Sequence, residues 1–419
     1  MHDMKKNKPA LYDVIVIGGG PAGAAVSTFL QRLGHRCLIL ESAAFPRYHI
    51  GESLIPHTYD TLDRLGLLPK LRASRFPKKY SVRFVSISGE ESEPFYFSET
   101  IAGDRAQTWQ VKRSEFDQIC LDNARENGVE VRMTTKVQEV VFEDGKVAGV
   151  SAKPNDGEPY QVRSKVVVDA SGRNTIIGSQ LGLKEAVPAL RKASLWSYYR
   201  GAKRLQGIDA GETTVFMIPD RGWFWYIPLP DDIVSVGVVA SPEYLFKTSD
   251  DSETLFLREV QKCGPLQERL AHATRTEPVR GLGELAYRNR QIAGNGWVMI
   301  GDAAAFLDPI YSSGLFLALA SAELAAACIH EGLVENDFSA EKLGAFVTPL
   351  QQGVDVIRRL IHAFYDPAFS FREFVEKYPQ HRAALIDCLV GDVIDKDMSF
   401  FLDALAQMTL PPEAIQSQP

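Results

Sequence analysis

Three glycines in the spacing Gly18-x-Gly20-x-x-Gly23 stand between an apolar run and a helical pattern. In such a turn the first glycine allows the tight bend, the second lets the backbone approach a pyrophosphate, and the third lets the helix pack closely. Pro21 and Ala22 open the helix, whose free N–H groups and positive dipole end attract an anion. These five residues therefore predict a dinucleotide-binding turn.

Two tryptophans and two lysines also have spacings that suggest chemistry. Trp223 and Trp225 face the same side of a strand, where they could wall a cofactor off from a substrate chamber or simply fill a core. Lys78 and Lys79 point to opposite faces if their segment is extended. Burial lowers the pKa of a lysine and favours its neutral, nucleophilic amine, whereas most lysines are solvated.

The elements around the glycine turn form one βαβ unit. Residues 14–17 predict a buried strand, a helix follows and stops near Gly34, and residues 37–40 predict a second parallel strand. Glu41 follows this strand about twenty residues after the glycines, where an acid accepts hydrogen bonds from ribose hydroxyls. We therefore expect Glu41 to bind the same dinucleotide.

The rest of the chain predicts an α/β fold. Strands are expected at residues 80–88, 93–97, 137–142, 147–152 and on both sides of 230–232, and helices from residue 314 onward. The apolar strands at 166–168 and 297–300 belong with the first sheet. Because these strands return to a sheet begun at the N-terminus, the two domains must be interleaved.

Composition excludes some classes of partner. The 419 residues are 45% hydrophobic and 24% charged, as in a globular protein, and the net charge of −7 gives no basic footprint for nucleic acid or a membrane surface. The 5 cysteines are widely spaced and the 8 histidines show no paired spacing. We therefore expect no disulfide framework, no metal site and a reducing, cytoplasmic compartment.

Four further segments resemble p-hydroxybenzoate-hydroxylase-like flavoproteins. Residues 111–117 resemble the helix start that carries an arginine in that group, residues 134–137 the adenine contact, and residues 168–172 and 300–304 its remaining FAD motifs. The resemblance implies that the dinucleotide is FAD. It also implies that Arg113, Val137 and Asp302 bind FAD, with Asp302 at the ribityl chain.

The same resemblance implies a GR2-type, Rossmann-like FAD-binding domain interleaved with a β-sheet substrate domain. The expected ranges are 1–80, 100–180 and 280–345 for the FAD-binding domain, and 81–99 and 181–279 for the substrate domain. Residues 346–419 form a helical C-terminal region. This region either packs on the substrate domain as an appendage or covers the substrate chamber.

Three stretches resemble the flavin-dependent halogenases, a tryptophan-halogenase-like family within that superfamily. Residues 223–228 resemble its W-x-W-x-I-P signature, residues 306–314 its F-x-x-P-x-x-S-x-G pattern, and residues 76–84 the stretch that holds its catalytic lysine. The resemblance implies that Lys79 is catalytic and that the amides of Ser313 and Gly314 hold the halide. Pro309 and Gly314 would also contact the flavin.

Residues 49–53 resemble the family's H-x-G-E-S segment, with Ile50 against the cofactor. Glu52 in this segment is either functional or a structural acid. Prenyl-lipid reductases of the same superfamily have similar segments, so this stretch supports FAD binding more than halogenation.

The resemblance implies a complete reaction. A separate flavin reductase supplies FADH2, oxygen gives the flavin C4a-hydroperoxide, and chloride or bromide is oxidised to hypohalous acid. The acid then passes the wall of Trp223 and Trp225, and Lys79 directs the halogen to a small aromatic ring, free or tethered to a carrier protein.

Two positions depart from the family. Tyr311 stands where tryptophan halogenases place a glutamate, which points to an electron-rich phenol or pyrrole that needs no such base. Ser81 replaces a glycine two residues after Lys79, which puts the lysine's pose in question.

Other functions are open to an FAD-binding fold, because fold alone does not decide activity. An aromatic monooxygenase would consume NADPH itself, and a prenyl-type reductase or dehydrogenase would need no oxygen. A flavin-binding protein without catalysis would act only by interaction. The tryptophan signature and Lys79 favour the halogenase.

Overall fold

The computed structural model describes residues 11–219, 222–394 and 396–410. Its first sheet is built around the parallel strands β1 (Leu11–Ile17), β2 (Cys37–Leu40) and β10 (Tyr160–Asp169), as expected from the sequence. The strand order is β19-β20-β10-β1-β2-β7, with β20 (Trp297–Met299) parallel to β10. The edge strands are β7 (Glu130–Arg132) and β19 (Ala293–Gly294).

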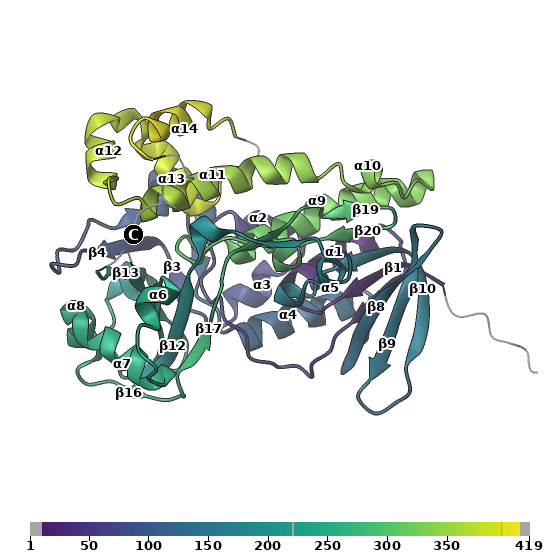
Figure 1. The fold of residues 1–419 in the computed structure, drawn as a ribbon, viewed down its shortest axis with the longest axis horizontal. Helices are drawn as coiled ribbons and strands as arrows, with labels where there is room; N and C mark the ends of the chain where they lie inside the picture. Colours follow the sequence, from purple (N-terminus) through teal and green to yellow (C-terminus); the bar gives the residue numbers. More distant parts are fainter. Residues whose placement is uncertain (1–10, 220–221, 395, 411–419) are drawn as a thin grey trace, which may run out of the picture.

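The two faces of the first sheet are covered differently. Val14 and Val16 of β1 pack against α1 (Pro21–Arg32), α4 (Arg113–Glu126) and α9 (Gly314–Glu335). Ile15 and Ile17 alternate with them and pack under the hairpin of β8 (Thr135–Glu143) and β9 (Lys146–Pro154). Figure 1 shows this hairpin projecting from the side of the sheet opposite α9.

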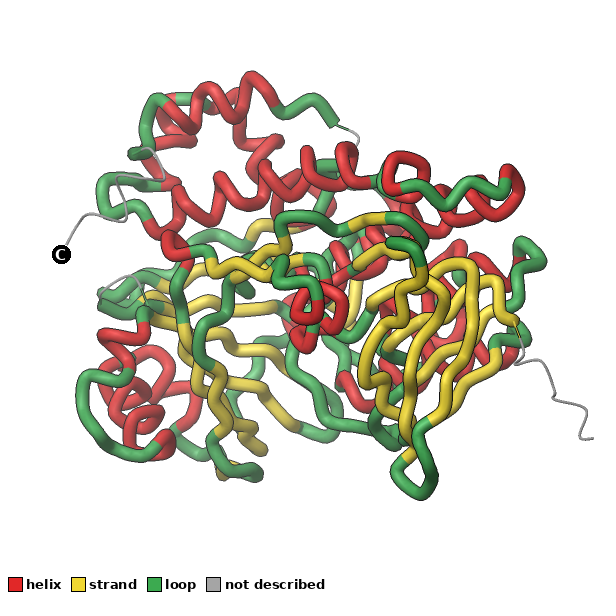
Figure 2. Tube along the Cα trace, turned by 45° about the vertical axis from the view of Figure 1, so that its right-hand side comes forward, coloured by secondary structure: helices red, strands yellow, loops and turns green. Residues whose placement is uncertain are grey.

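The second sheet has the order β16-β12-β15-β14-β13-β4-β5, with β17 also paired to β12. Strand β4 (Ser81–Val85) pairs parallel with β13. The second sheet therefore includes a segment that lies, in sequence, between the motifs at residues 18–23 and 111–117. Figure 2 shows the two sheets as separate sets of strands. The other bounds are β5 (Phe95–Tyr96), β12 (Ala193–Arg200), β13 (Thr213–Met217), β14 (Trp223–Pro228), β15 (Ile233–Ala240), β16 (Thr274–Arg275) and β17 (Arg280–Leu282).

Alternation along β14 divides the core of this sheet. Trp223, Trp225 and Ile227 join a cluster that includes the C-terminal helices, whereas Phe224 and Tyr226 join the opposite cluster. The C-terminal helices are α11 (Val347–Tyr365), α12 (Phe371–Lys377), α13 (Arg382–Val390) and α14 (Ser399–Ala406), drawn in green to yellow in Figure 1. The helical region therefore buries its apolar side chains on the tryptophan face.

Shorter elements complete the description. β3 (Lys78–Lys79) pairs antiparallel with β6 (Thr108–Trp109), and β11 (Lys184–Ala186), β18 (Tyr287–Asn289) and β21 (Ala305–Phe306) form a small sheet. The remaining α-helices are α2 (Thr58–Arg64), α3 (Leu68–Arg72), α5 (Ile176–Gln180), α6 (Pro242–Leu245), α7 (Ser252–Lys262), α8 (Gly264–Leu270) and α10 (Ala340–Leu343).

Two expected strands are shorter than the sequence pattern suggested. The strand expected at 80–88 is β4, which ends at Val85 because Ser86 and Gly89 form a turn closed by the Gly89 N–H. The strand expected at 93–97 is only β5, since Phe97 begins a short 3-10 helix.

Among the described residues, α9 is the one helix that is long and apolar enough to cross a membrane. A core helix passes the same test, and α9 packs against α1 through Leu319, Ala322 and other buried side chains.

Candidate active site

A cavity of about 820 Å³ runs from the glycine turn to the tryptophan strand. The segments expected to bind FAD meet in it although they are far apart in sequence. The predicted residues that line it are Gly18, Gly20, Pro21, Ala22, Glu41, Ile50, Arg113, Val137, Trp223, Trp225, Asp302, Pro309, Ser313 and Gly314. Gly23 and Lys79 do not line it.

The glycine turn packs too closely against the backbone for side chains at two of its positions. Gly18 has φ +102°, and a Cβ there would lie 2.5 Å from the carbonyl oxygen of Ala170. A Cβ at Gly23 would lie 2.0 Å from the carbonyl oxygen of Gly18, so Gly23 allows close packing rather than ligand contact. This backbone suits the pyrophosphate of FAD.

Glu41 is buried at the end of β2 and fixes the loops beside it. Its Oε2 accepts a hydrogen bond of 2.7 Å from the amide of Gly19, and its Oε1 accepts one of 2.7 Å from the amide of Ala43. The carboxylate therefore lines the cavity in a fixed orientation.

Arg113 begins α4 and is buried beside the cavity. Its guanidinium donates to both oxygens of Asp117, at 2.8 and 3.1 Å, and to the carbonyls of Ile50 and Gly51. Burial opposes its charge, but Asp117 outweighs burial and raises the pKa of Arg113. Arg113 therefore stays charged and holds the segment that carries Ile50.

Asp302 follows β20 and is partly buried. Burial raises the pKa of its carboxyl to about 6, and the nearby charges of Arg113 and Arg173 oppose this rise. The side chain lines the cavity, which is where a hydroxyl-rich ribityl chain would need an acceptor.

Lys79 is completely buried on β3, whereas Lys78 points to solvent, as the alternation predicts. Its Nζ donates to Ser53 Oγ at 2.9 Å and to the carbonyl of Leu54 at 3.3 Å, and lies 5.5 Å from the centre of the Phe97 ring. Burial lowers the pKa of Lys79 to about 7, and only the more distant Glu212 opposes it. None of the described residues pairs a carboxylate with this amine.

The amine of Lys79 lies one hydroxyl behind the cavity wall. Ser53 and Thr213 both line the cavity, and their hydroxyl oxygens are 3.2 Å apart. Gln110 donates to Thr213 Oγ1 at 2.8 Å and to the carbonyl of Gly211 at 2.9 Å, which fixes this wall. A small molecule that reached Ser53 would be separated from the amine of Lys79 by the Ser53 hydroxyl alone.

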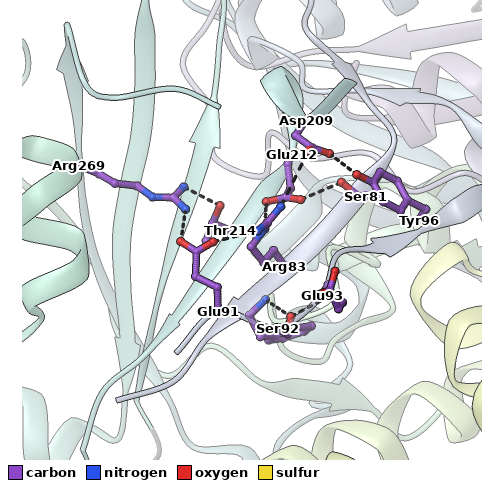
Figure 3. A network of polar contacts seen from close by, with 11 residues as sticks. Ser81, Arg83, Glu91, Ser92, Glu93, Tyr96, Asp209, Glu212, Thr214 and Arg269 are labelled. Atoms are coloured by element: carbon purple, nitrogen blue, oxygen red, sulfur yellow. Dashed lines mark hydrogen bonds and ion pairs between the residues drawn. The ribbon is translucent and has the colours of Figure 1, made fainter. Parts of the chain in front are cut away.

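Ser81 lies within the regular strand β4, so the replacement of the family glycine introduces no turn. Its hydroxyl donates to Glu212 Oε2 at 3.0 Å, and Arg83 Nε donates to the other carboxylate oxygen at 2.9 Å. Figure 3 shows this network, which continues through Glu91 to Arg269. Ser81 therefore anchors the strand that follows Lys79.

The two signature tryptophans form a wall, with ring centroids 6.2 Å apart. Trp223 Nε1 donates at 2.9 Å to the hydroxyl of Tyr365, which donates at 3.0 Å to Asp308 Oδ2. Trp225 Nε1 donates to Ser235 Oγ at 3.0 Å. Because Tyr365 ends α11, the C-terminal region contacts both the wall and the 306–314 loop, as a cover would.

The loop before α9 presents free backbone donors. Ser312 has φ +55°, a left-handed conformation that is strained for a non-glycine residue. Within the described residues the amides of Ser313 and Gly314 have no hydrogen-bond partner, and a Cβ at Gly314 would meet nothing within 4 Å. The helix start thus leaves room for a small anion at the cavity.

Tyr311 is buried and donates to the carbonyl of Leu360 at 3.3 Å. Burial raises its pKa well above the usual range, so the phenol stays neutral. The nearest carboxyl on the same loop, Asp308, is held by Tyr365 and by the amide of Ile310.

Several residues around the site carried no recognisable local signal. Gln110, Thr213 and Tyr365 reach the site only through the tertiary fold, and Glu212 is identified only by its bond to Ser81. Ser53 did have a signal, because it ends the 49–53 segment, but its contact with Lys79 could not be read from sequence.

Comparison with known proteins adds independent findings. A family model described as an FAD binding domain matches residues 11–329. The 1H-pyrrole-2-carbonyl-(peptidyl-carrier protein) chlorinase of Pseudomonas fluorescens is 30% identical over 97% of this chain and 94% of its own. The solved structure of the flavin-dependent brominase Bmp2 has a TM-score of 0.86 at 30% identity, covering 95% of this chain and 99% of that chain. A flavoprotein/dehydrogenase from Cytophaga hutchinsonii has a TM-score of 0.87 at 27% identity, over 97% and 99% of the two chains.

Proposed function

Because this chain belongs to the flavin-dependent halogenases, we propose that it halogenates an electron-rich ring of phenol or pyrrole type, with Lys79 placing the halogen. When bound, reduced FAD would react with O2 and so supply the oxidant that converts halide to hypohalous acid. The residues of the chain bind FAD, hold the halide and direct the product of that oxidation.

The buried amine of Lys79 carries this proposal. It is completely enclosed, has hydroxyl, carbonyl and aromatic neighbours instead of a carboxylate, and lies one hydroxyl behind the cavity. Such a lysine exchanges readily between charged and neutral forms near neutral pH. A charged amine can hydrogen-bond hypohalous acid, and a neutral one can accept the halogen as a haloamine.

The halide is proposed to bind at the amides of Ser313 and Gly314. Both amides are free, they begin a helix of 22 residues, and the space beside Gly314 is open. Trp223 and Trp225 then separate the flavin side of the cavity from the aromatic substrate. Reaction at Lys79 instead of at the flavin would account for a halogenated product rather than a hydroxylated one.

The substrate class rests on position 311. A buried, neutral tyrosine there cannot act as a carboxylate base, so the ring must be electron-rich already. The Pseudomonas fluorescens relative acts on a pyrrole carried by a peptidyl-carrier protein, which makes a carrier-tethered ring a specific alternative to a free one.

A separate flavin reductase is the proposed source of reduced FAD, and the five cysteines carry free thiols, which suits a cytoplasmic enzyme. The proposed division places residues 1–80, 100–180 and 280–345 in the FAD-binding domain, and 81–99 and 181–279 in the substrate domain. Strands β4 and β13 come from the two separate segments of the proposed substrate domain, and their pairing supports this division.

The function is tested by supplying purified protein with FAD, a flavin reductase, NADH, air and bromide, together with a panel of phenols and pyrroles. Each ring is offered free and as a carrier-protein thioester. The expected result is a product with the paired-isotope mass signature of bromine. Hydroxylated product in place of brominated product would contradict the proposal.

The halide site has a test of its own in Gly314→Ala. The added methyl group meets no atom within 4 Å in the folded chain, so it occupies only the space assigned to the halide. We expect a higher KM for bromide, and FAD affinity is measured in parallel because Gly314 is also expected to contact the flavin. Gly264→Ala is the matched control, because Gly264 also begins a helix and also has open space around it. Equal KM values in the two variants would place the halide elsewhere.

A further inference from the structure

Glu52 is a buried carboxyl that the mechanism above does not use. It lines the cavity and is 4% exposed. Its Oε1 accepts a hydrogen bond of 2.8 Å from the hydroxyl of Tyr198. Among the described residues no donor meets Oε2 with hydrogen-bond geometry, although the Ser235 hydroxyl is near enough to favour the charged form of the carboxyl. Buried polar atoms are almost always hydrogen-bonded, so an unpartnered carboxyl oxygen beside a ligand cavity indicates a group that acts on what binds there.

The hydrogen bonds continue from Glu52 toward the surface. The hydroxyls of Tyr198 and Tyr48 are 3.0 Å apart, and Trp196 Nε1 donates to the Tyr48 hydroxyl at 2.6 Å. Tyr48 is 42% exposed, in contrast to Glu52 and Tyr198. The chain of hydroxyls therefore has a solvent end at Tyr48 and a buried end at Glu52.

The groups at the two ends of this hydrogen-bonded series determine which hydroxyl donates and which accepts in each bond. An indole N–H can only donate, so Tyr48 accepts from Trp196 and must use its own proton elsewhere. Tyr198 donates to Glu52, so the bond between the two tyrosines runs from Tyr48 to Tyr198. The hydroxyl protons of Tyr48 and Tyr198 therefore both point along the series toward Glu52.

Aromatic halogenation needs a proton at a buried site. The oxidation of FADH2 releases two electrons and two protons, and conversion of an aromatic C–H and a halide ion to C–halogen releases two electrons and one proton. Reduction of O2 to two water molecules takes four electrons and four protons. One proton per turnover must therefore enter from solvent, in step with the halide anion.

We propose that Tyr48, Tyr198 and Glu52 form the path by which this proton enters the active site. Glu52 gives the proton on its Oε2 to the reactants in the cavity. Tyr198 then gives its hydroxyl proton to Oε1 of Glu52, and Tyr48 gives its own hydroxyl proton to Tyr198. The Tyr48 hydroxyl is refilled from water, and rotation of the carboxyl group resets Glu52. The O–H bonds that break and form are equal in number, so the path carries protons and no electrons.

The surroundings of Glu52 suit this role. Burial raises the pKa of its carboxyl to about 7, and Ser235, Tyr198 and Arg113 oppose the rise while Glu277 adds to it. Arg280 lies over the Tyr48 ring at 4.0 Å at the outer end of the path. A carboxyl with this pKa holds a proton near neutral pH and can also release it.

Infrared spectroscopy tests the protonation of Glu52 without any turnover. The full-length FAD-loaded protein is labelled with glutamate that carries 13C at its side-chain carboxyl, which separates Glu52 from Asp302 and Asp308, two aspartates whose pKa is also raised. We expect a protonated-carboxyl band that is present near pH 6, titrates with a pKa of about 7, and is missing from Glu52→Gln. A wild-type protein without this band near pH 6 would overturn the proposal.

Turnover tests the path itself. Glu52→Gln is expected to lower the halogenation rate roughly 10²-fold, the usual contribution of one positioned acid. Tyr198→Phe keeps the acid but breaks the chain, so its rate should fall and then recover as a small buffer acid such as imidazolium is added. Tyr199→Phe is the matched control, since Tyr199 is the next residue on β12, is similarly buried and packs on the opposite face.

This inference rests on the proposed function, but the two fail differently. A wild-type protein that forms no halogenated product contradicts the proposed function, while the infrared titration still reports on Glu52. A halogenating wild type, with Tyr198→Phe as fast as Tyr199→Phe and insensitive to buffer acid, contradicts the path alone. Thermal unfolding of each variant identifies any loss that comes from misfolding.

Discussion

Arg113 and Lys79 are both buried cations close to one cavity, and they are held in opposite ways. Arg113 donates to both oxygens of Asp117 and to two carbonyls, and its pKa is raised. Lys79 has one hydroxyl, one carbonyl and one aromatic ring around its amine, and its pKa falls to about 7.

The difference lies in the partner, because burial is nearly equal. Arg113 is 6% exposed and Lys79 is 0% exposed. A carboxylate partner outweighs the cost of burial and fixes the charge, which suits a residue that holds the cofactor segment. Without such a partner the charge becomes switchable, which suits a residue that must act both as a charged donor and as a neutral nucleophile.

The largest effect on folding is expected from removing the charge of Asp117. Asp117→Asn leaves the buried Arg113 without a carboxylate, and it also removes the carboxylate partner of the partly exposed Arg47. Breaking a buried pair costs about 3–5 kcal/mol, so we expect a loss of that size in the free energy of unfolding, together with weaker FAD binding. Chemical denaturation and flavin fluorescence titration measure the two effects.

Asp122→Asn is the control for that variant. Asp122 lies on the same helix but forms an exposed pair with Arg125, which should contribute little. Similar losses in the two variants would mean that the burial of the Arg113 pair has no special weight.

Lys79 should make stability depend on pH in the opposite sense from a lysine whose charge is paired with a carboxylate. Between pH 7 and its ordinary value of 10.5, the folded chain holds Lys79 neutral while the unfolded chain holds it charged. Because the unfolded state binds more protons, this residue's contribution to stability rises by about 1.4 kcal/mol per pH unit in that window. The contribution is lowest below pH 7, where the folded protein must bury the charge.

Lys79→Met removes this dependence. We expect the variant to be more stable than the wild type near pH 7, with the difference shrinking toward pH 10, as measured by denaturation at several pH values. Lys78→Met, at the exposed neighbouring position, controls for the loss of a surface lysine. A difference that stays constant across this range would mean that Lys79 remains charged in the folded protein.

The smallest effect is expected at Ser81. Ser81→Gly restores the family residue but removes the hydrogen bond to Glu212, which is worth about 1 kcal/mol. We expect a few-fold decrease in halogenation turnover and an unchanged KM for halide. Ser92→Gly, in the same network but partly exposed, is the comparison. A rate equal to the wild type would mean that Glu212 does not help to fix the strand after Lys79.

The elements around Arg113 and the glycine turn could largely be predicted from sequence. The glycine turn, the strands at 37–40 and 166–168, and the helix start at Arg113 are local patterns, and the structure has them where they were expected. Cofactor-binding motifs of this kind are readable because strand, turn and helix follow one another within a few residues.

The surroundings of the Lys79 amine could be predicted from sequence only in part. Alternation predicted that Lys78 and Lys79 face opposite sides, and the family resemblance singled out Lys79. The partners of the amine come from residues 53, 54 and 97 on other elements. The bond between Trp223 and Tyr365 joins positions 142 residues apart, and no local pattern predicts it. Long-range packing decides whether a buried cation has a carboxylate partner, and that decides its chemistry.

The most direct test of the account follows where the oxidised halogen goes. Wild type and Lys79→Met are supplied with reduced FAD, oxygen, bromide and a substrate ring, along with a soluble 1,3-dicarbonyl compound that traps free hypobromous acid. The account predicts brominated substrate and little brominated trap for the wild type, and the reverse for the variant. Equal yields of brominated substrate from the two proteins would contradict the role of Lys79.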